Sequence, residues 1–71
     1  MVWLTVNEDG SEYLFSEHPV LRDGKFIPQK FLYHYDDGDV EHYANYIKMP
    51  KGSIKKLLGR ELTFEESPIL L

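Results

Sequence analysis

Apolar and polar residues alternate over residues 2–6, and a second short apolar run follows at 13–15. An Asp-Gly pair at 9–10 separates the two segments. Such a pair is typical of a tight hairpin turn, because glycine adopts positive φ at little cost. A turn centred on this pair places Val6 opposite Tyr13. The pattern therefore predicts one face with Val2, Leu4, Val6, Tyr13 and Phe15, and an opposite face with Trp3, Thr5 and Leu14.

Two further Asp-Gly pairs, at 23–24 and 37–38, also lie between apolar runs and predict two more hairpins. The pair at 37–38 joins two segments rich in aromatic and β-branched residues. A two-residue turn there pairs Tyr35 with Val40. A three-residue loop with a bulge shifts the pairing by one residue and exchanges the two faces. The sequence is compatible with both registers.

A helical pattern follows the break at 50–52, and we expect one short helix near residues 53–59. Ser53 is placed to cap its first turn and Gly59 to end it. A helix of this length is not stable alone, so it is expected to pack on the sheet through one apolar stripe. That stripe comprises Ile54, Leu57 and Leu58.

The last nine residues contain a second capping signal and an apolar end. Thr63 and Glu66 have the spacing of a capping box, which predicts a single turn before Pro68. The apolar segment 69–71 is expected to pair as a terminal strand or to contact a partner.

Together these elements predict one domain over residues 1–71, of the α+β class. We expect a small antiparallel sheet built as a meander of hairpins, with four to six strands and one short helix near 53–59 packed on it. The predicted core comprises Trp3, Leu4, Val6, Phe15, Phe26, Phe31, Ile54, Leu57, Leu58 and Phe64.

Two segments, WLTVNEDGSE at 3–12 and PKGSIKKLLGRELTF at 50–64, resemble a group of small proteins encoded by gut anaerobic bacteria and by their phages and mobile elements. The matching segments cover about half the chain, near its two ends, and leave 16–49 outside the resemblance. That group has no assigned activity, so the resemblance implies no catalytic residue. It implies a cytoplasmic accessory protein.

Composition narrows the possible functions. The chain has 71 residues, a formal net charge of −4 and no cysteine, which excludes disulfides, thiolate nucleophiles and cysteine-ligated metal centres. No apolar run approaches the ~18 residues of a membrane span. The first residues lack the basic segment of a leader peptide. We therefore expect a cytoplasmic protein without a membrane partner.

Groups that could carry chemistry are few. The chain has no serine elbow and no glycine-rich phosphate loop. The three histidines, His18, His34 and His42, are the candidate zinc ligands, but a zinc site needs three or four ligands that converge on one face. His34 and His42 share a strand face only in the shifted register. We expect no enzymatic activity, metal, cofactor or small-molecule substrate. Four carboxylates that could bind a cation such as Ca²⁺ lie around one predicted turn: Asp36, Asp37, Asp39 and Glu41. Their spacing does not match an EF-hand, and aspartate residues also favour a turn by themselves.

A basic segment supports one of two functional hypotheses. Five cations without an intervening acid can follow a phosphate backbone, and neighbouring aromatic residues could stack on bases. Nucleic-acid binding is therefore the alternative function, although cations late in a helix also complement its dipole. The candidate phosphate-contacting residues are Lys48, Lys51, Lys55, Lys56 and Arg60.

The tyrosines support the preferred hypothesis. Five tyrosines exceed what a core of this size needs, and tyrosine is enriched at protein–protein contacts. We therefore expect a non-enzymatic protein-interaction module whose partner is another protein or a second copy of the chain. The candidate partner surface comprises Tyr33, Tyr35, Tyr43 and Tyr46.

Overall fold

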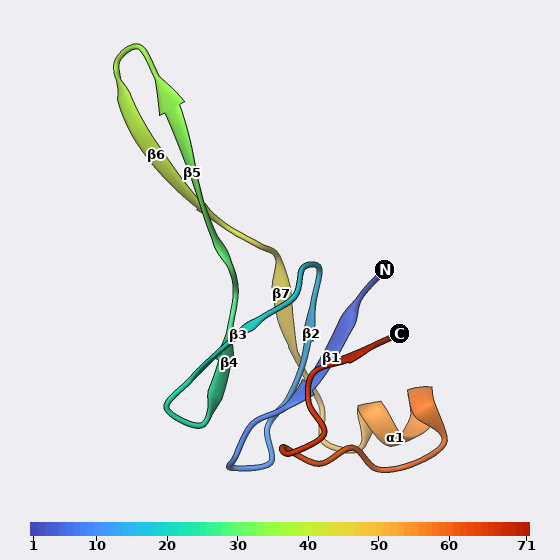
Figure 1. Ribbon diagram of the computed structural model, residues 1–71. Coiled ribbons are helices and arrows are strands. Elements are labelled where there is room, and N and C mark those ends of the chain that lie inside the picture. The colour runs from blue at the N-terminus through green and yellow to red at the C-terminus, as the bar shows by residue number, and fades with distance from the viewer.

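The computed structural model describes residues 1–71 as eight strands and one helix, in one four-stranded and two two-stranded antiparallel sheets (Figure 1). The α+β class is confirmed in this broad sense, with helix as the minor part. The prediction of one sheet with four to six strands is wrong, because residues 16–45 form two separate hairpins. The elements are β1 (Trp3–Val6), β2 (Glu12–Phe15), β3 (Val20–Arg22), β4 (Lys25–Ile27), β5 (Lys30–Tyr35), β6 (Gly38–Tyr43), β7 (Tyr46–Met49), α1 (Ser53–Leu58) and β8 (Ile69–Leu70).

The first hairpin, β1–β2, has a three-residue loop where the sequence predicted a two-residue turn. The Asn7 N–H donates to the Ser11 carbonyl (2.8 Å), and the Gly10 N–H donates to the Asn7 carbonyl (2.9 Å). Gly10 takes a φ of 91°. The longer loop shifts the register by one residue, so the predicted grouping of Tyr13 and Phe15 with Leu4 is wrong. One face carries Leu4, Val6, Glu12 and Leu14, and the other carries Trp3, Thr5, Tyr13 and Phe15.

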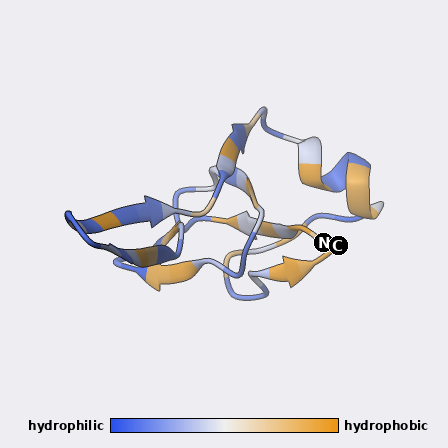
Figure 2. Cartoon of the chain, turned by 90° about the horizontal axis from the view of Figure 1, so that it is seen from above, coloured by the Kyte–Doolittle hydropathy of each residue, from blue (hydrophilic) through white to orange (hydrophobic).

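The four-stranded sheet, in the order β7-β2-β1-β8, packs α1 against the face that carries Leu4. Leu4, Ile54 and Leu62 form the buried centre, surrounded by half-buried apolar side chains. The helix ends as predicted: Gly59 has a φ of 77°, and its N–H donates to the Lys55 carbonyl (2.8 Å). Leu57 is 50% exposed and does not pack on the sheet, so its predicted place in the core is wrong. Figure 2 colours β8 and much of α1 as hydrophobic.

Thr5 and Phe15 are fully buried on the opposite face of the sheet. Segments of the chain that follow β2 pack on this face. The His18 ring packs on Trp3 with ring centroids 4.5 Å apart. The β3–β4 hairpin is fixed to the loop after β1, since the Phe26 N–H donates to Asn7 Oδ1 (2.9 Å). Its two-residue turn, residues 23–24 with positive φ at both, confirms the predicted hairpin.

The chain ends in the terminal strand β8, which pairs with β1 and confirms the first of the two expectations for the apolar end. Before it, Glu66 accepts hydrogen bonds from the Thr63 N–H (3.3 Å) and hydroxyl (3.1 Å). The predicted capping pair therefore forms, in a turn. The Ser67 hydroxyl accepts the Val6 N–H (3.0 Å), so this turn also satisfies a donor on the edge of β1.

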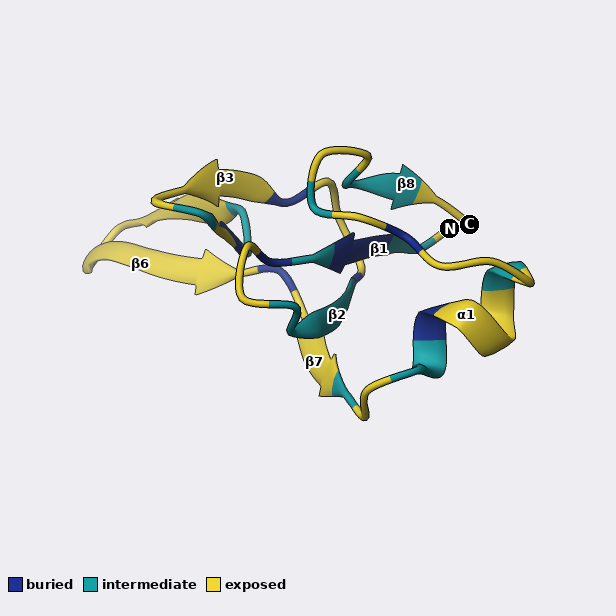
Figure 3. Ribbon diagram, turned by 90° about the horizontal axis from the view of Figure 1, so that it is seen from below, coloured by how far each residue is buried: buried dark blue, intermediate teal, exposed yellow.

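The strands β5 and β6 project from the rest of the molecule as a two-stranded ribbon (Figure 1). Every residue of both strands is exposed, as Figure 3 shows for β6. The molecule measures 48 × 24 × 18 Å with a radius of gyration of 13.9 Å, against about 11 Å for a compact domain of this length. Its accessible surface of 5187 Å² also exceeds the roughly 4,600 Å² expected for its mass.

The base of the ribbon is anchored in the four-stranded sheet by the segment 38–49. This segment pairs with β5 up to Ala44, whose N–H donates to the Gln29 carbonyl (2.9 Å). From Asn45 onward it pairs with β2, since the Asn45 carbonyl accepts the Ser16 N–H (2.9 Å). Ala44 is buried at this transition. The core therefore holds one end of the ribbon and leaves its length and tip free.

Candidate interaction surface

The ribbon has two chemically different faces, which its register defines. Tyr35 pairs with Gly38 and Tyr33 with Val40, so Asp36 and Asp37 form the turn. The predicted pairing of Tyr35 with Val40 is wrong by two residues. A shift of two leaves every side chain on its predicted face, because side chains alternate with a period of two.

The first face, which we call the aromatic face, consists of Phe31, Tyr33 and Tyr35 from β5 and Val40 and His42 from β6. The three aromatic side chains of β5 are 37, 50 and 55% exposed, in chain order. The rings of Tyr33 and His42 meet edge to face across the two strands, with centroids 4.8 Å apart. No Lys, Arg, Asp or Glu lies on this face. Phe31 was predicted in the core, and that prediction is wrong because β5 lies outside the core and every residue of it is exposed.

The second face, the charged face, carries two polar side-chain pairs, one between His34 and Asp39 and one between Lys30 and Glu41. His34 and Asp39 lie directly opposite, with Nδ1 and Oδ1 2.8 Å apart, and Lys30 Nζ lies 3.4 Å from Glu41 Oε1. Leu32 and Tyr43 complete this face. The exposed ion pair between Lys30 and Glu41 stabilises the ribbon only modestly and suits a solvent-facing side. The two faces therefore differ in charge, and Figure 2 shows hydrophobic bands along the otherwise hydrophilic strands of the ribbon.

The aromatic face lies on an element that is weakly stable by itself. An isolated two-stranded hairpin is marginal in water, whereas a third strand or a packed apolar face gives independent stability. With about 200 Å² for each aromatic side chain, the exposed fractions of Phe31, Tyr33 and Tyr35 leave about 300 Å² of ring surface open. This size lies at the lower end of the largest apolar patch on an ordinary monomer, a patch that is often functional.

The four tyrosines predicted as one partner surface are all exposed, but the structure does not bring them together. Tyr33 and Tyr35 share the aromatic face, and Tyr43 points to the charged face. Tyr46 lies on β7, where its ring stacks on Phe15 with centroids 5.5 Å apart. Phe31, Val40 and His42 complete the surface, although the prediction did not include them. The prediction selected residues by type and took only tyrosines, whereas the alternation of side chains along the two strands decides which residues share a face.

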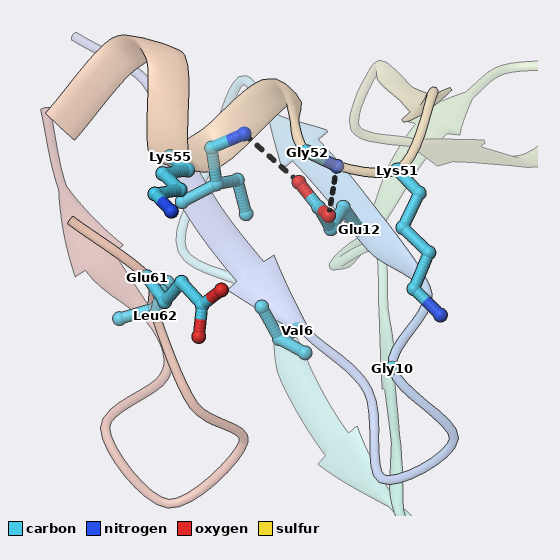
Figure 4. Close-up of a pocket in the computed structure, with 9 residues that line it drawn as sticks. Val6, Gly10, Glu12, Lys51, Gly52, Lys55, Glu61 and Leu62 are labelled. Atoms are coloured by element: carbon cyan, nitrogen blue, oxygen red, sulfur yellow. Dashed lines mark hydrogen bonds between the residues drawn. The ribbon is translucent and has the colours of Figure 1, made fainter. Parts of the chain in front are cut away.

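The predicted phosphate-contacting residues lie on β7, the following loop, α1 and the segment after it, and all five are exposed. Acidic side chains lie among them. Glu12 and Glu61 line the same depression of about 290 Å³ as Lys51 and Lys55 (Figure 4). Arg60 pairs with Glu66 at 3.2 Å. The basic run in the sequence is therefore not a continuous basic surface, and the strands β5 and β6, which carry the aromatic residues, project away from α1 (Figure 1).

Glu12 has a structural role that the sequence analysis missed. Its carboxylate accepts the Gly52 N–H (2.7 Å) and the Ile54 N–H (2.8 Å), which are free donors at the start of α1 (Figure 4). Ser53 was predicted as the cap, but it is the first residue of α1, and its hydroxyl donates to the Pro50 carbonyl. No sequence signal identifies Glu12, because 40 residues separate it from Gly52.

Two exposed carboxylates have lowered pKa values, each because a local turn donates hydrogen bonds to it. The Ser11 backbone N–H donates to Asp9 and lowers the pKa of that carboxyl, with a smaller contribution from the nearby lysines. The Thr63 hydroxyl and N–H lower the pKa of Glu66, and Arg60 adds to the effect. Both groups stabilise turns and lie outside the ribbon.

The structure brings together no group of three or more histidine, aspartate or glutamate side chains that could hold a metal ion. His34 and His42 lie on opposite faces of the ribbon, as the register without the bulge predicts.

No helix has the length and apolar character needed to cross a membrane. Comparison of the chain with protein-family models, with curated proteins and with solved structures finds no match.

Proposed function

We propose that this chain is a non-enzymatic protein-interaction module that docks through the aromatic face of the β5–β6 ribbon. The observation that carries the proposal is a row of three aromatic side chains, 37 to 55% exposed, on a face without charged groups. Aromatic residues are enriched and charged residues depleted at the centre of protein interfaces. The charged face of the same ribbon, with its Lys30–Glu41 ion pair and its His34–Asp39 hydrogen bond, is suited to remain in solvent.

Nucleic-acid binding through residues 48–60 is the alternative, and the charge distribution gives it less support. Glu12, Glu61 and Glu66 lie among the five cations, and phosphate recognition favours an unbroken positive surface. The alternative predicts salt-sensitive binding that the double substitution Lys55→Glu, Lys56→Glu removes.

Affinity capture from a lysate of the native cells, in nuclease-treated and untreated halves, tests the proposal. The matched variants are Tyr35→Ser on the aromatic face and Tyr43→Ser on the charged face, whose side chains are 55 and 58% exposed. We expect nuclease-resistant capture by the wild type and by Tyr43→Ser, and at least a tenfold loss for Tyr35→Ser. Equal capture by the two variants would contradict the proposed surface, and capture that nuclease abolishes would support the alternative.

A further inference from the structure

We propose that the aromatic face is covered by the same face of a second copy of this chain, with the two ribbons antiparallel about a two-fold axis. This inference rests on the proposed function, because it names the occupant of the same docking surface. Symmetric pairing through one shared patch is the commonest arrangement of protein dimers. Two properties of the ribbon favour a copy of itself, the neutrality of its face and the charges at its ends, and a third, the area available, determines how strong the dimer is.

The first property is the lack of charge on the aromatic face. In a two-fold dimer each residue of the patch meets the same patch, so any charged side chain near the axis is brought toward its own like charge. Phe31, Tyr33, Tyr35 and Val40 carry no charge, and His42 is neutral in its unprotonated form. The charged face could not pair in this way, since Asp39 and Glu41 would be brought near their copies.

The second property is the difference in charge between the two ends of the ribbon. Asp36 and Asp37 form the tip, and Lys48 lies beyond the base on β7, on the same side of the sheet as Tyr46. A two-fold axis at the Phe31–His42 pair directs each tip toward the base of the other copy, because the tip lies about five residues from the axis and residues 46–48 follow the base at a similar separation along the chain. Each acidic tip then approaches the other copy's Lys48, an exposed cation that lines a surface depression together with Asp9. A parallel arrangement would bring four tip carboxylates together, which is unfavourable.

The third property is the area, which predicts a weak dimer. The three aromatic side chains of the face, together with Val40 at 45% and Tyr46 at 49% exposure, offer about 450 Å² on each copy. The dimer would bury about 900 Å² in total, below the ~1,200 Å² at which stable specific interfaces begin and within the range of weak, transient ones. We therefore expect a weak dimer that dissociates on dilution within the concentration range of the test below.

Sedimentation velocity of the full chain from about 5 to 500 μM, at low ionic strength, tests the inference. We expect a reversible monomer–dimer equilibrium for the wild type and for Tyr43→Ser. Tyr35→Ser is expected to weaken dimerisation at least tenfold. The charge pattern is tested by the tip variant Asp36→Lys, Asp37→Lys and by the base variant Lys48→Glu. Each is expected to weaken the dimer several-fold, whereas the triple variant that combines them restores it.

The outcomes separate this inference from the proposed function. A wild type that stays monomeric at 500 μM overturns the second copy as occupant. If lysate capture in that case still depends on Tyr35 and not on Tyr43, the proposed docking surface stands with a different protein on it. If capture is also independent of Tyr35, both proposals fail. A dimer that Tyr35→Ser leaves unchanged, or a triple variant weaker than either charge variant, contradicts the antiparallel face-to-face arrangement. Circular dichroism of each variant establishes that it is folded.

Discussion

Phe15→Ala is expected to remove most of the stability of this chain. Phe15 is fully buried on β2, a central strand of the four-stranded sheet, and its ring stacks on Tyr46 with centroids 5.5 Å apart. Removing a fully buried phenylalanine side chain lowers the free energy of unfolding by about 3–5 kcal/mol, from lost burial and the cavity left behind. A chain of this length has about 4–10 kcal/mol in total. Urea denaturation should therefore show a large loss, and the melting temperature should fall by about 15 °C or more.

Phe31→Ala is the matched control, because it removes the same side chain from β5 of the ribbon. Phe31 is 37% exposed and lies outside the buried cluster. We expect a decrease of less than about 1 kcal/mol in the free energy of unfolding. Similar losses for the two variants would mean that the ribbon packs as part of the core and that its aromatic face is already covered.

Glu12→Gln is expected to destabilise the docking of α1. The carboxylate accepts two backbone donors, Gly52 N–H and Ile54 N–H, and an amide group offers only one oxygen to accept them. The loss of a charged acceptor leaves one donor without a partner at a part-buried position. We expect the free energy of unfolding to fall by about 1–3 kcal/mol, measured by urea denaturation at neutral pH.

Glu61→Gln provides the control for charge, because Glu61 lines the same depression and its carboxylate makes no hydrogen bond. The substitution removes the same unit of charge from a surface that also carries Lys51 and Lys55. A change below about 0.5 kcal/mol is expected. If both variants lose the same stability, the effect of Glu12 is one of charge and not of the two hydrogen bonds that it accepts.

The local elements of this fold could be predicted from sequence because short-range chemistry determines them. Glycine with positive φ marks the loops at Gly10 and Gly24 and the end of α1 at Gly59. The alternation of side chains gave the two observed faces of the ribbon in only one of the two registers that the sequence left open, and that register is itself off by two residues. In contrast, the predicted faces of β2 are wrong, because the loop before it has one more residue than predicted and shifts the pairing by one. Whether an Asp-Gly pair forms a two- or three-residue loop depends on how the strands pack, which the pair itself does not encode.

The arrangement of these elements could not be predicted, because it depends on long-range contacts. Phe15 and Phe31 are both phenylalanines in apolar strands, but only Phe15 lies under a second layer. Nothing near Phe31 in the sequence indicates that β5 and β6 leave the core. Glu12 likewise acts on donors 40 residues away. The sequence correctly pointed to exposed tyrosines, but the pairing of β5 with β6 was needed to separate Tyr35 from Tyr43.

Residue-resolved amide hydrogen exchange tests the central claim most directly, that the aromatic face is a docking surface on an otherwise uncovered ribbon. It should be measured on dilute protein and again with the surface occupied, either by the chain itself at 500 μM or by a captured partner. In the dilute sample we expect protected amides in β1 and β2 and rapid exchange along β5 and β6. Occupation should slow exchange selectively at residues 31–42. Unchanged exchange in the ribbon, together with new protection at α1 and residues 48–60, would contradict the account and move the interaction surface to the basic segment.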